Sequence, residues 1–310
     1  MKTSDLWSIS NLQKNVTLQS YSWWRIGGTA DNFIEVSSQS QLKQAISKLR
    51  SSDLPYCVIG QGTNLLFDDS GYRGCVIRIG NGLSALGLEG DRISVEAGCW
   101  VPRLALFAAR NGLSGLEHAI GIPASFGGLV CMNGGSQRKN IGELIESVTV
   151  LTPEGMLRTD PVFECGFGYR KSRYQKSGDI VLRATLRFER TRSYEDQRVE
   201  MLQILRERSR KFPRKLPSCG SVFKSSPALY EAYGPPGKII EDLGFKGKVR
   251  GRIQVSPAHA NFIVNLGGGS SSDILALVYE IHAAVLSKTG ISMQPEFLYV
   301  DPITGPKEVL

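Results

Sequence analysis

The sequence contains two glycine-rich stretches, GQGTNLL at residues 60–66 and GIPASFGGLVCMNGGS at residues 121–136. The first follows a short apolar run at residues 56–59. Its glycines therefore predict a turn at the end of a strand, where the backbone is able to approach a ligand. It is not a dinucleotide-binding fingerprint, because Leu65 stands where the third glycine would be. Taken alone, the first stretch also suits an ordinary turn between strands.

The second stretch strengthens the ligand interpretation of the first. Its small residues expose consecutive backbone N–H groups, and such groups bind phosphate oxygens. A third small-residue bend, GGTA at residues 27–30, follows WWRI at residues 23–26. Two such loops in one half of the chain suit a ligand that carries a diphosphate and flat rings.

Composition and net charge exclude several classes of protein. The chain has 310 residues, of which 41% are apolar and 21% charged, so it has enough apolar side chains for a core and is not disordered as a whole. Its 34 glycines are an excess, but they show no collagen period. Lys and Arg total 37 against 29 Asp and Glu, and the resulting net charge of +8 attracts anions.

A basic run raises the alternative of a nucleic-acid binder. Six basic residues lie between Arg206 and Lys215. Because cations favour the C-terminal end of a helix, we interpret the run as a solvated helix end. No nucleic-acid-binding motif accompanies it, so we expect no nucleic-acid partner. Salt-sensitive binding to DNA or RNA would support the alternative.

Three features of the sequence indicate its cellular setting and its lack of metal ligands: the N-terminal residues, the cysteines and the histidines. The first residues, MKTSDLWSISNLQKN, contain no apolar run after the lysine, which argues against a secretory signal. No stretch approaches ~18 consecutive apolar residues, so no membrane span is expected. The closest two of the six cysteines are eighteen positions apart, and we interpret all six as reduced thiols of a cytoplasmic protein. The three scattered histidines predict no metal site.

Hydrophobic patterning predicts a mixed α+β chain with a seam near residue 190. Helices are expected where apolar residues recur with helical spacing, at 40–49, 104–110 and 195–210, and after the capping residues 270–273 as far as Gly290. In the last of these, Leu286 is expected on the apolar side. Strands are expected at 56–59, 75–79, 93–97, 148–152, 182–188 and 291–300.

At the glycine-rich stretches 60–66 and 121–136 the chain resembles a known family of flavoproteins, the UDP-N-acetylenolpyruvoylglucosamine reductases, or MurB family. Each motif of the resemblance is short, but their order along nearly the whole chain is specific. The motifs are RIGGTA at 25–30, GQGTNLL at 60–66, the stretch 121–136, YRKS at 169–172, GSVFK at 220–224, HANF at 259–262 and PE at 295–296. Thr63 and the pair Ala124-Ser125 depart from the usual pattern, but they keep small side chains and a hydroxyl.

The resemblance implies an α+β fold with two domains. An FAD-binding module of the vanillyl-alcohol-oxidase (PCMH) type, with an N-terminal segment, is expected over 1–190, and a smaller α+β substrate-binding domain over 191–310. The implied cofactor is tightly bound, non-covalent FAD, with NADPH as the hydride donor. The residues implied to bind FAD are Gly60, Gln61, Gly62, Thr63, Asn64, Leu65, Gly121, Ile122, Pro123, Ser125, Gly127, Gly128, Asn133 and Gly134.

The implied reaction reduces an enol ether: NADPH gives hydride to FAD, and reduced FAD gives it to the enolpyruvyl group of a UDP-sugar. Hydride addition leaves negative charge beside the carboxylate, where a cation is stabilising, and a proton donor must then reach the adjacent carbon. The resemblance assigns these two roles to Arg170 and Ser221. It assigns to Glu296 the role of orienting the donor or passing it a proton.

From the residues alone these roles stay open. Arg170 then reads as a surface arginine in a basic stretch, and Ser218 is as good a donor as Ser221. Glu296 reads as an exposed glutamate after a proline, although a single charge within an apolar strand favours a function. Cys219 has no partner histidine and is interpreted as a bystander.

Further substrate contacts follow from the same resemblance. A UDP-linked carboxylate carries at least three negative charges, and Lys224, Lys238 and Arg252 lie in the matching segment to meet them. Tyr169 is a candidate to face the substrate or simply to pack, and Asn261 to reach a ligand or to serve the framework.

The chain is assigned to the smaller class of the family. The short distance between Arg252 and Ser270 leaves little room for the tyrosine-bearing loop that closes on the substrate in other members. A rival function is an oxidase on the same flavin module, which would pass electrons to oxygen. His118 is the nearest candidate for the covalent flavin link that such oxidases often carry. The sequence carries no signal for an oligomeric state.

Overall fold

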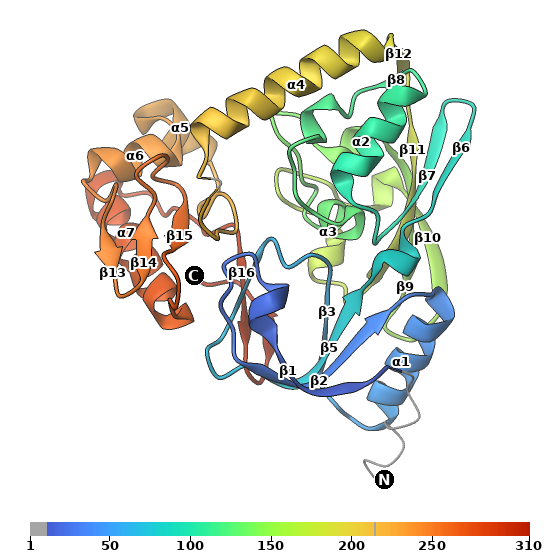
Figure 1. The fold of residues 1–310 in the computed structure, drawn as a ribbon, viewed down its shortest axis with the longest axis horizontal. Coiled ribbons are helices and arrows are strands. Elements are labelled where there is room, and N and C mark those ends of the chain that lie inside the picture. Colours follow the sequence, from blue (N-terminus) through green and yellow to red (C-terminus); the bar gives the residue numbers. More distant parts are fainter. Residues whose placement is uncertain (1–10, 214) are drawn as a thin grey trace. The chain divides into compact units, whose positions relative to one another are not determined.

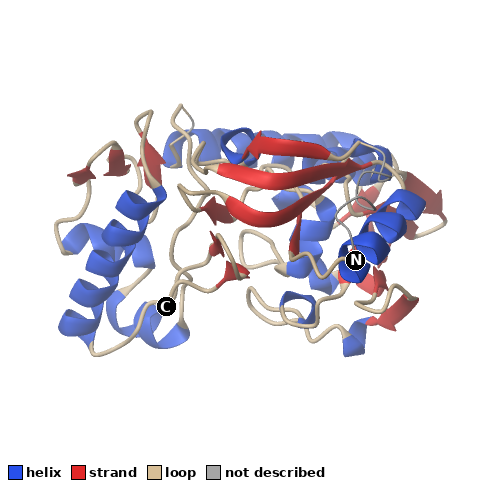
Figure 2. Ribbon diagram, turned by 90° about the horizontal axis from the view of Figure 1, so that it is seen from below, coloured by secondary structure: helices blue, strands red, loops and turns tan. Residues whose placement is uncertain are grey.

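The structure is a computed structural model that describes residues 11–213 and 215–310 (Figure 1). Most of the N-terminal stretch that argued against a secretory signal lies outside these residues. Within the described part of the chain, no helix is long and apolar enough to cross a membrane. Figure 2 shows the helices and strands joined by long loops. Short 3-10 helices lie at Leu18–Tyr21, Asn81–Leu83, Glu117–Ala119, Ile141–Glu143, Val162–Glu164 and Arg173–Gln175.

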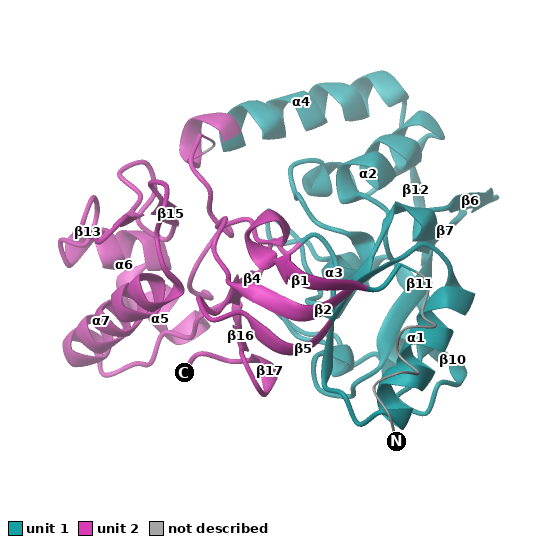
Figure 3. Ribbon diagram, turned by 60° about the horizontal axis from the view of Figure 1, so that its bottom comes forward, with its two compact units in different colours: residues 1–12, 34–61, 76–208 teal, residues 13–33, 62–75, 209–310 magenta. Residues whose placement is uncertain are grey.

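The chain divides into two compact units, neither of which is continuous in sequence (Figure 3). Their described residues are 11–12, 34–61 and 76–208 in unit 1, and 13–33, 62–75, 209–213 and 215–310 in unit 2. The units therefore group the chain differently from the expected division at residue 190. Strands β2 (Thr29–Val36) and β5 (Tyr72–Ile79) each contribute residues to both units.

Unit 1 is built on a five-stranded antiparallel sheet with the strand order β10-β9-β11-β7-β6. Its strands are β6 (Leu86–Glu89), β7 (Arg92–Glu96), β9 (Ile145–Leu151), β10 (Leu157–Pro161) and β11 (Ile180–Arg187). In the register of the central strand, Ala184 lies opposite both Val95 and Val148. Strand β11 alternates buried apolar residues with exposed arginines, which confirms the strand predicted near residues 182–188.

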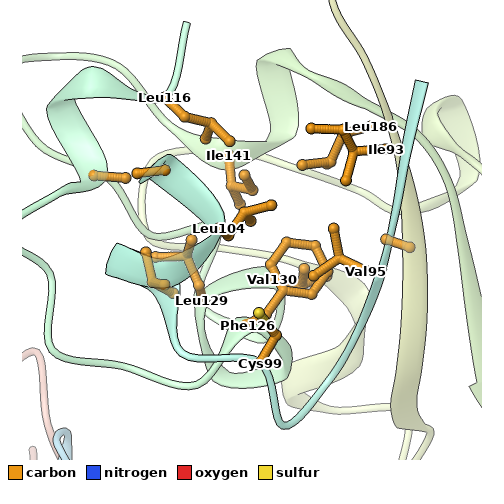
Figure 4. Packing of buried hydrophobic residues seen from close by; sticks show 14 of the residues in the cluster. Ile93, Val95, Cys99, Leu104, Leu116, Phe126, Leu129, Val130, Ile141 and Leu186 are labelled. Atoms are coloured by element: carbon orange, nitrogen blue, oxygen red, sulfur yellow. The ribbon is translucent and has the colours of Figure 1, made fainter. Parts of the chain in front are cut away.

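The core of unit 1 packs this sheet against helices α2 (Val101–Arg110) and α3 (Phe126–Cys131). Figure 4 shows Phe126 and Val130 of α3 beside Val95 of β7. Helix α2 was expected, because Pro102 suits its first turn and Asn111-Gly112 its end. Helix α3 was not expected, since two adjacent glycines lower helix propensity.

The remaining elements of unit 1 are mostly those that the patterning predicts. Helix α1 (Gln39–Ser51) is capped by Ser38, whose side chain accepts a hydrogen bond from the backbone N of Gln41 at 3.2 Å. Helix α4 (Tyr194–Lys211) confirms the helix expected at 195–210, and its last three residues belong to unit 2. Strands β8 (Leu113–Ser114) and β12 (Arg190–Thr191) form a small sheet, and β3 (Tyr56–Ile59) belongs to a sheet with the order β1-β2-β5-β3, in which β1 is Gln13–Thr17.

Among its described residues, unit 2 has three complete α-helices and two three-stranded sheets, besides strand β1 and the 3-10 helix Leu18–Tyr21. The helices are α5 (Pro227–Tyr233), α6 (Pro236–Asp242) and α7 (Ser271–Thr289). The sheets are β13 (Val249–Arg250), β14 (Ile253–Val255) and β15 (Ile263–Asn265), and β17 (Gly305–Lys307), β16 (Leu298–Asp301) and β4 (Leu65–Phe67). Trp24 is fully buried in the core, donates from its Nε1 to the backbone O of Ile263 at 2.8 Å and meets Phe297 edge-on at 5.0 Å.

Two expectations for the C-terminal residues were wrong. The strand expected over 291–300 is shorter, because β16 begins only at Leu298. Pro295, within the missing part, has no N–H to donate to a ladder. Leu286 was expected on the buried side of α7 but is 41% exposed. It follows the buried Val285 by one position, which turns its side chain about 100° away from the buried stripe.

Candidate active site

The two glycine-rich stretches meet inside unit 1. A Cβ atom on Gly60 would overlap with the Oγ of Ser125, so the end of β3 is in contact with the residue that precedes α3. A Cβ on Gly127 would lie 2.8 Å from the Cβ of Ala97, and the backbone N of Gly127 donates to the backbone O of Ala97 at 2.8 Å. The start of α3 is thereby fixed to the end of β7.

The rest of the first stretch belongs to unit 2. Gly62 has a φ of +65°, and a Cβ there would overlap with the carbonyl oxygen of Tyr21. Asn64 lies two residues further on, and its Nδ2 donates to the backbone O of Glu296 at 3.0 Å. Its own backbone O accepts from the backbone N of Leu298 at 3.0 Å. Asn64 thus fixes the segment that carries Glu296.

Several glycines of the two stretches are needed because other parts of the same chain pack directly against them. Besides Gly60 and Gly62, Gly134 is in contact with the side chain of Leu129, since a Cβ would lie 2.6 Å from its Cδ1. The glycine requirement therefore does not by itself indicate a ligand.

The backbone amides of the first stretch fit a phosphate-bearing cofactor. Among the described residues, no protein acceptor is hydrogen-bonded to the amides of Gln61, Gly62 or Thr63. Consecutive amide donors of this kind are what the diphosphate of FAD requires. Gln61 is additionally oriented by Arg78, whose Nη2 donates to its Oε1 at 3.4 Å.

Arg170 lies at the tip of a tight turn in unit 1. Gly168 and Lys171 exchange backbone hydrogen bonds of 3.0 and 3.1 Å, which places Tyr169 and Arg170 at the two corners. Arg170 has a φ of +52°, which is uncommon for a residue with a Cβ. Its Nη2 donates to the backbone O of Gly135 at 3.0 Å, and its guanidinium lies 5.4 Å from the Tyr169 ring centroid. The arginine is thus attached to the second glycine-rich stretch.

The segments that carry Ser221 and Glu296 are neighbours inside unit 2, although 75 positions separate the two residues in the sequence. The backbone N of Glu296 donates to the backbone O of Val222 at 2.7 Å. On the other side, the backbone N of Val222 donates to the backbone O of Asn261 at 2.9 Å. Ser221 and Glu296 are both half-buried on this small scaffold.

The candidate substrate residues of unit 2 differ in what their side chains do. Asn261 is 6% exposed and uses its carboxamide to accept from the backbone N and donate to the backbone O of Phe223, both at 3.0 Å. It therefore serves the framework beside Ser221. Lys224 is half-buried, and its ammonium forms no ion pair with another described residue.

Two further cations of unit 2 are occupied by the protein itself. The ammonium of Lys238 is exposed and pairs with Asp242 one helical turn away. The Nε of Arg252 donates to the backbone O of Gly267 at 3.0 Å.

Comparison with known proteins identifies the family of this chain. Residues 212–300 match the family model of the UDP-N-acetylenolpyruvoylglucosamine reductase C-terminal domain, and residues 30–160 match that of an FAD binding domain. The UDP-N-acetylenolpyruvoylglucosamine reductase 1 of Corynebacterium glutamicum is 44% identical over 92% of this chain and 85% of its own length. This chain belongs to the UDP-N-acetylenolpyruvoylglucosamine reductase (MurB) family.

Other MurB proteins agree in sequence and in fold. The reductase of Heliobacterium modesticaldum is 40% identical over 88% of this chain and 85% of its own length. The crystal structure of MurB from Thermus caldophilus matches with a TM-score of 0.77 at 34% identity, and covers 92% of this chain and 97% of that one. The expected family and the α+β class, with an FAD-binding module and a MurB C-terminal domain, are confirmed.

His118, the candidate for a covalent flavin link, is 2% exposed in this MurB chain. Its Nδ1 accepts from the backbone N of Ser136 at 3.4 Å, and the Ser136 Oγ donates to its backbone O at 2.6 Å. Burial and the nearby Lys139 lower the pKa of His118 to about 4, so the ring is neutral at pH 7. Its hydrogen bonds close the second glycine-rich stretch on itself.

Cys219 lies beside Ser221 in sequence, but its thiol is buried. The Sγ is 3.6 Å from the backbone O of Leu65. Burial raises the pKa of Cys219 to about 12, so the side chain is a thiol and not a nucleophilic thiolate at neutral pH.

Arg208 has a contact that its sequence pattern did not predict. A Cβ on Gly121 would overlap with the Cδ of Arg208, so this residue of α4 lies against the second glycine-rich stretch within unit 1. The basic run was interpreted as solvated, and a spacing pattern does not show which of its members turns inward.

Proposed function

We propose that this MurB protein reduces the enolpyruvyl group of UDP-N-acetylglucosamine enolpyruvate to UDP-N-acetylmuramate in peptidoglycan precursor synthesis, with NADPH as the hydride source. The observation that carries the proposal is the placement of Arg170 against the second glycine-rich stretch, in a chain that contains the whole ordered set of family motifs. When bound by the two stretches, FAD supplies the hydride chemistry, accepting from NADPH and donating to the enolpyruvyl double bond.

Arg170 stabilises the negative charge that develops on the substrate. Its guanidinium is permanently charged, and its planar fork suits a carboxylate. Its bond to the backbone O of Gly135 fixes the side chain at the stretch assigned to the flavin. A preorganised cation of this kind acts on the transition state without reorganising as the reaction proceeds.

Ser221 donates the proton that completes the reduction. A hydroxyl is a weak acid, so it must be held at the reacting carbon and resupplied with a proton. The backbone contact between Val222 and Glu296 supports a role for the carboxyl group as the orienting or proton-passing partner.

Substrate anions are bound chiefly by Lys224, with Tyr169 beside Arg170. Lys238 and Arg252 contribute only if they leave Asp242 and the Gly267 carbonyl. Asn261 acts indirectly, through Phe223. Residues 253–270 contain two short strands, the turns that connect them and the N-cap residue of α7, Ser270, which supports the smaller class without the tyrosine loop.

The cellular setting of this reaction is the bacterial cytoplasm. All six cysteines, which lie in the described part of the chain, are free, as expected in a reducing compartment. NADPH and the UDP-linked substrate are small anions of that compartment, and the +8 charge favours their approach. No nucleic-acid or membrane partner is proposed.

Two half-reactions test the assignment. The purified protein should be yellow, bleach with NADPH and regain its colour when the enolpyruvyl substrate is added. In Arg170→Ala and Ser221→Ala, reduction by NADPH should stay within about twofold of wild type, while reoxidation by substrate should slow by roughly 100-fold or more. Lys171→Ala, next to Arg170, is the matched control and should reoxidise normally.

Three results would contradict the proposal. A protein that binds no FAD after refolding with the cofactor would remove its basis. Rapid reoxidation by air without substrate would indicate an oxidase, and flavin that stays attached after acid denaturation would indicate a covalent link. Normal reoxidation in Arg170→Ala or Ser221→Ala would exclude that residue's role.

A further inference from the structure

We propose that Gln175 is a positioning residue for Arg170, holding the backbone of the turn that presents the guanidinium. The inference rests on the proposed role of Arg170. Gln175 is half-buried and ends the 3-10 helix that follows the turn. Its Nε2 donates to the backbone O of Arg170 at 3.1 Å and to the Sδ of Met132 at 3.2 Å.

The conformation of Arg170 needs such support. The residue stands at the second corner of a two-residue turn with a φ of +52°, where glycine or asparagine is favoured. A side chain with a Cβ persists there only when surrounding contacts determine the backbone. The hydrogen bond from Gln175 to the Arg170 carbonyl fixes the peptide group that follows the Cα of Arg170, and so restricts the backbone from which the side chain leaves the turn.

Neighbouring hydrogen bonds fix the rest of the turn to the end of α3. The Nδ2 of Asn133 donates to the backbone O of Gly168 at 2.8 Å. The Oγ of Ser172, which is 3% exposed, donates to the backbone O of Cys131 at 2.6 Å. These two bonds act on the flanks of the turn, whereas the bond from Gln175 acts on the carbonyl of the arginine itself.

Loss of the carboxamide therefore has a specific consequence. The backbone at residue 170 relaxes towards negative φ, and the guanidinium moves away from the Gly135 carbonyl. A displacement of about 1 Å in a catalytic group costs up to roughly 100-fold in rate. The effect is expected in the step that uses Arg170 and not in the reduction of the flavin by NADPH.

Gln175→Met tests this, because methionine has nearly the same length and cannot donate. The matched control is Gln197→Met: Gln197 is 1% exposed, and its Nε2 donates to a backbone carbonyl, that of Arg192, at 3.0 Å in the same unit. We expect Gln175→Met to slow substrate-dependent reoxidation by at least about tenfold and to leave NADPH reduction within about twofold. Gln197→Met should leave both rates within about twofold, even if it lowers the melting temperature.

A double variant shows whether Gln175 acts through Arg170. Arg170→Ala/Gln175→Met should reoxidise as slowly as Arg170→Ala alone, since effects on one acting group do not multiply. If Gln175→Met slows both backgrounds by the same factor, the positioning role is wrong. If Arg170→Ala reoxidises slowly but Gln175→Met reoxidises at the wild-type rate, the positioning role of Gln175 is wrong and the proposed role of Arg170 stands. If Arg170→Ala reoxidises normally, both the proposed role of Arg170 and the positioning role of Gln175 are wrong.

Hydrogen exchange supplies a readout that does not depend on turnover. In Gln175→Met, the peptide covering residues 166–175 should exchange at least about tenfold faster than in wild type, while Gln197→Met leaves it unchanged. Equal exchange in all three proteins would overturn the inference. Should Gln175→Met fail to fold, Gln175→Asn, which withdraws the carboxamide by one methylene, is measured with the same expected results.

Discussion

His118 illustrates how one buried side chain makes stability depend on pH. In the unfolded chain the ring takes up a proton below its ordinary pKa of about 6.5. In the folded chain, burial and Lys139 keep it neutral down to about pH 4. Between these values the unfolded state binds more protons, so the free energy of unfolding falls as pH is lowered through this window.

We therefore expect His118 to account for up to roughly 3 kcal/mol of the stability lost between pH 6.5 and pH 4. In His118→Gln, the decline in the free energy of unfolding over this window should be shallower by about that amount. Chemical unfolding with excess FAD at several pH values measures it. An unchanged slope in His118→Gln would exclude the assignment.

Residue types alone left much of the candidate site undetermined. Arg170 and Ser221 occur in stretches whose composition suits a basic surface and a turn, and only the ordered motifs singled them out. The carboxamides of Asn64 and Asn261 bind backbone groups at Glu296 and Phe223. Such partners are set by tertiary structure and leave no local pattern, so the sequence assigned Asn64 to the cofactor and left Asn261 open between a ligand contact and a framework role.

At the scale of elements, the N-terminus of α7 is capped from a distant part of unit 2. Ser270 caps it locally, accepting from the backbone N of Asp273 at 3.1 Å. Asp69, two hundred positions earlier, accepts from the backbone N of Ser271 at 2.8 Å and of Ser272 at 3.3 Å. A carboxylate at this position satisfies free amides and favours the helix dipole.

Asp69→Ala should therefore destabilise the protein by about 1–2 kcal/mol. Urea unfolding at pH 7 measures the change. Asp242→Ala removes an exposed carboxylate that pairs with Lys238, and its cost should stay below about 0.5 kcal/mol. Equal losses in the two variants would show that Asp69 does not act as a cap.

The success of sequence patterning varied with the length of the element. Helices α1, α2, α4 and α7 each present several turns of apolar spacing, and all four were predicted. Strand β4 has three residues, too few to show a period, and its parallel partner β16 lies more than 200 positions away. Pairing at that separation is decided by the fold as a whole, so β4 was not predicted and β16 was predicted too long.

At the scale of the whole molecule, unit 2 depends on chain segments from far apart. Trp24 and Leu66 are buried in the same core as Phe297. A fragment consisting of residues 209–310 lacks the first two. Removal of a fully buried large side chain costs about 3–5 kcal/mol, a large share of the stability of a small unit.

We therefore expect the fragment 209–310 to be unfolded or only loosely packed. Near-UV circular dichroism and urea unfolding should show no cooperative transition. Addition of separate peptides covering residues 13–33 and 62–75 should restore part of the signal. A fragment that unfolds cooperatively alone would show that the core of unit 2 is complete without them.

The five boundaries between the units, after residues 12, 33, 61, 75 and 208, have a consequence for synthesis on the ribosome. Residues 62–75 emerge early, but their unit is not complete until residue 310, which is 235 residues later (310 − 75). At ordinary translation speeds this delay is roughly 10–50 s. During it, the apolar residues of these early segments stay without their final neighbours. Exposed apolar surface of this kind promotes aggregation, so we expect the yield of the folded protein to depend on chaperones during this interval.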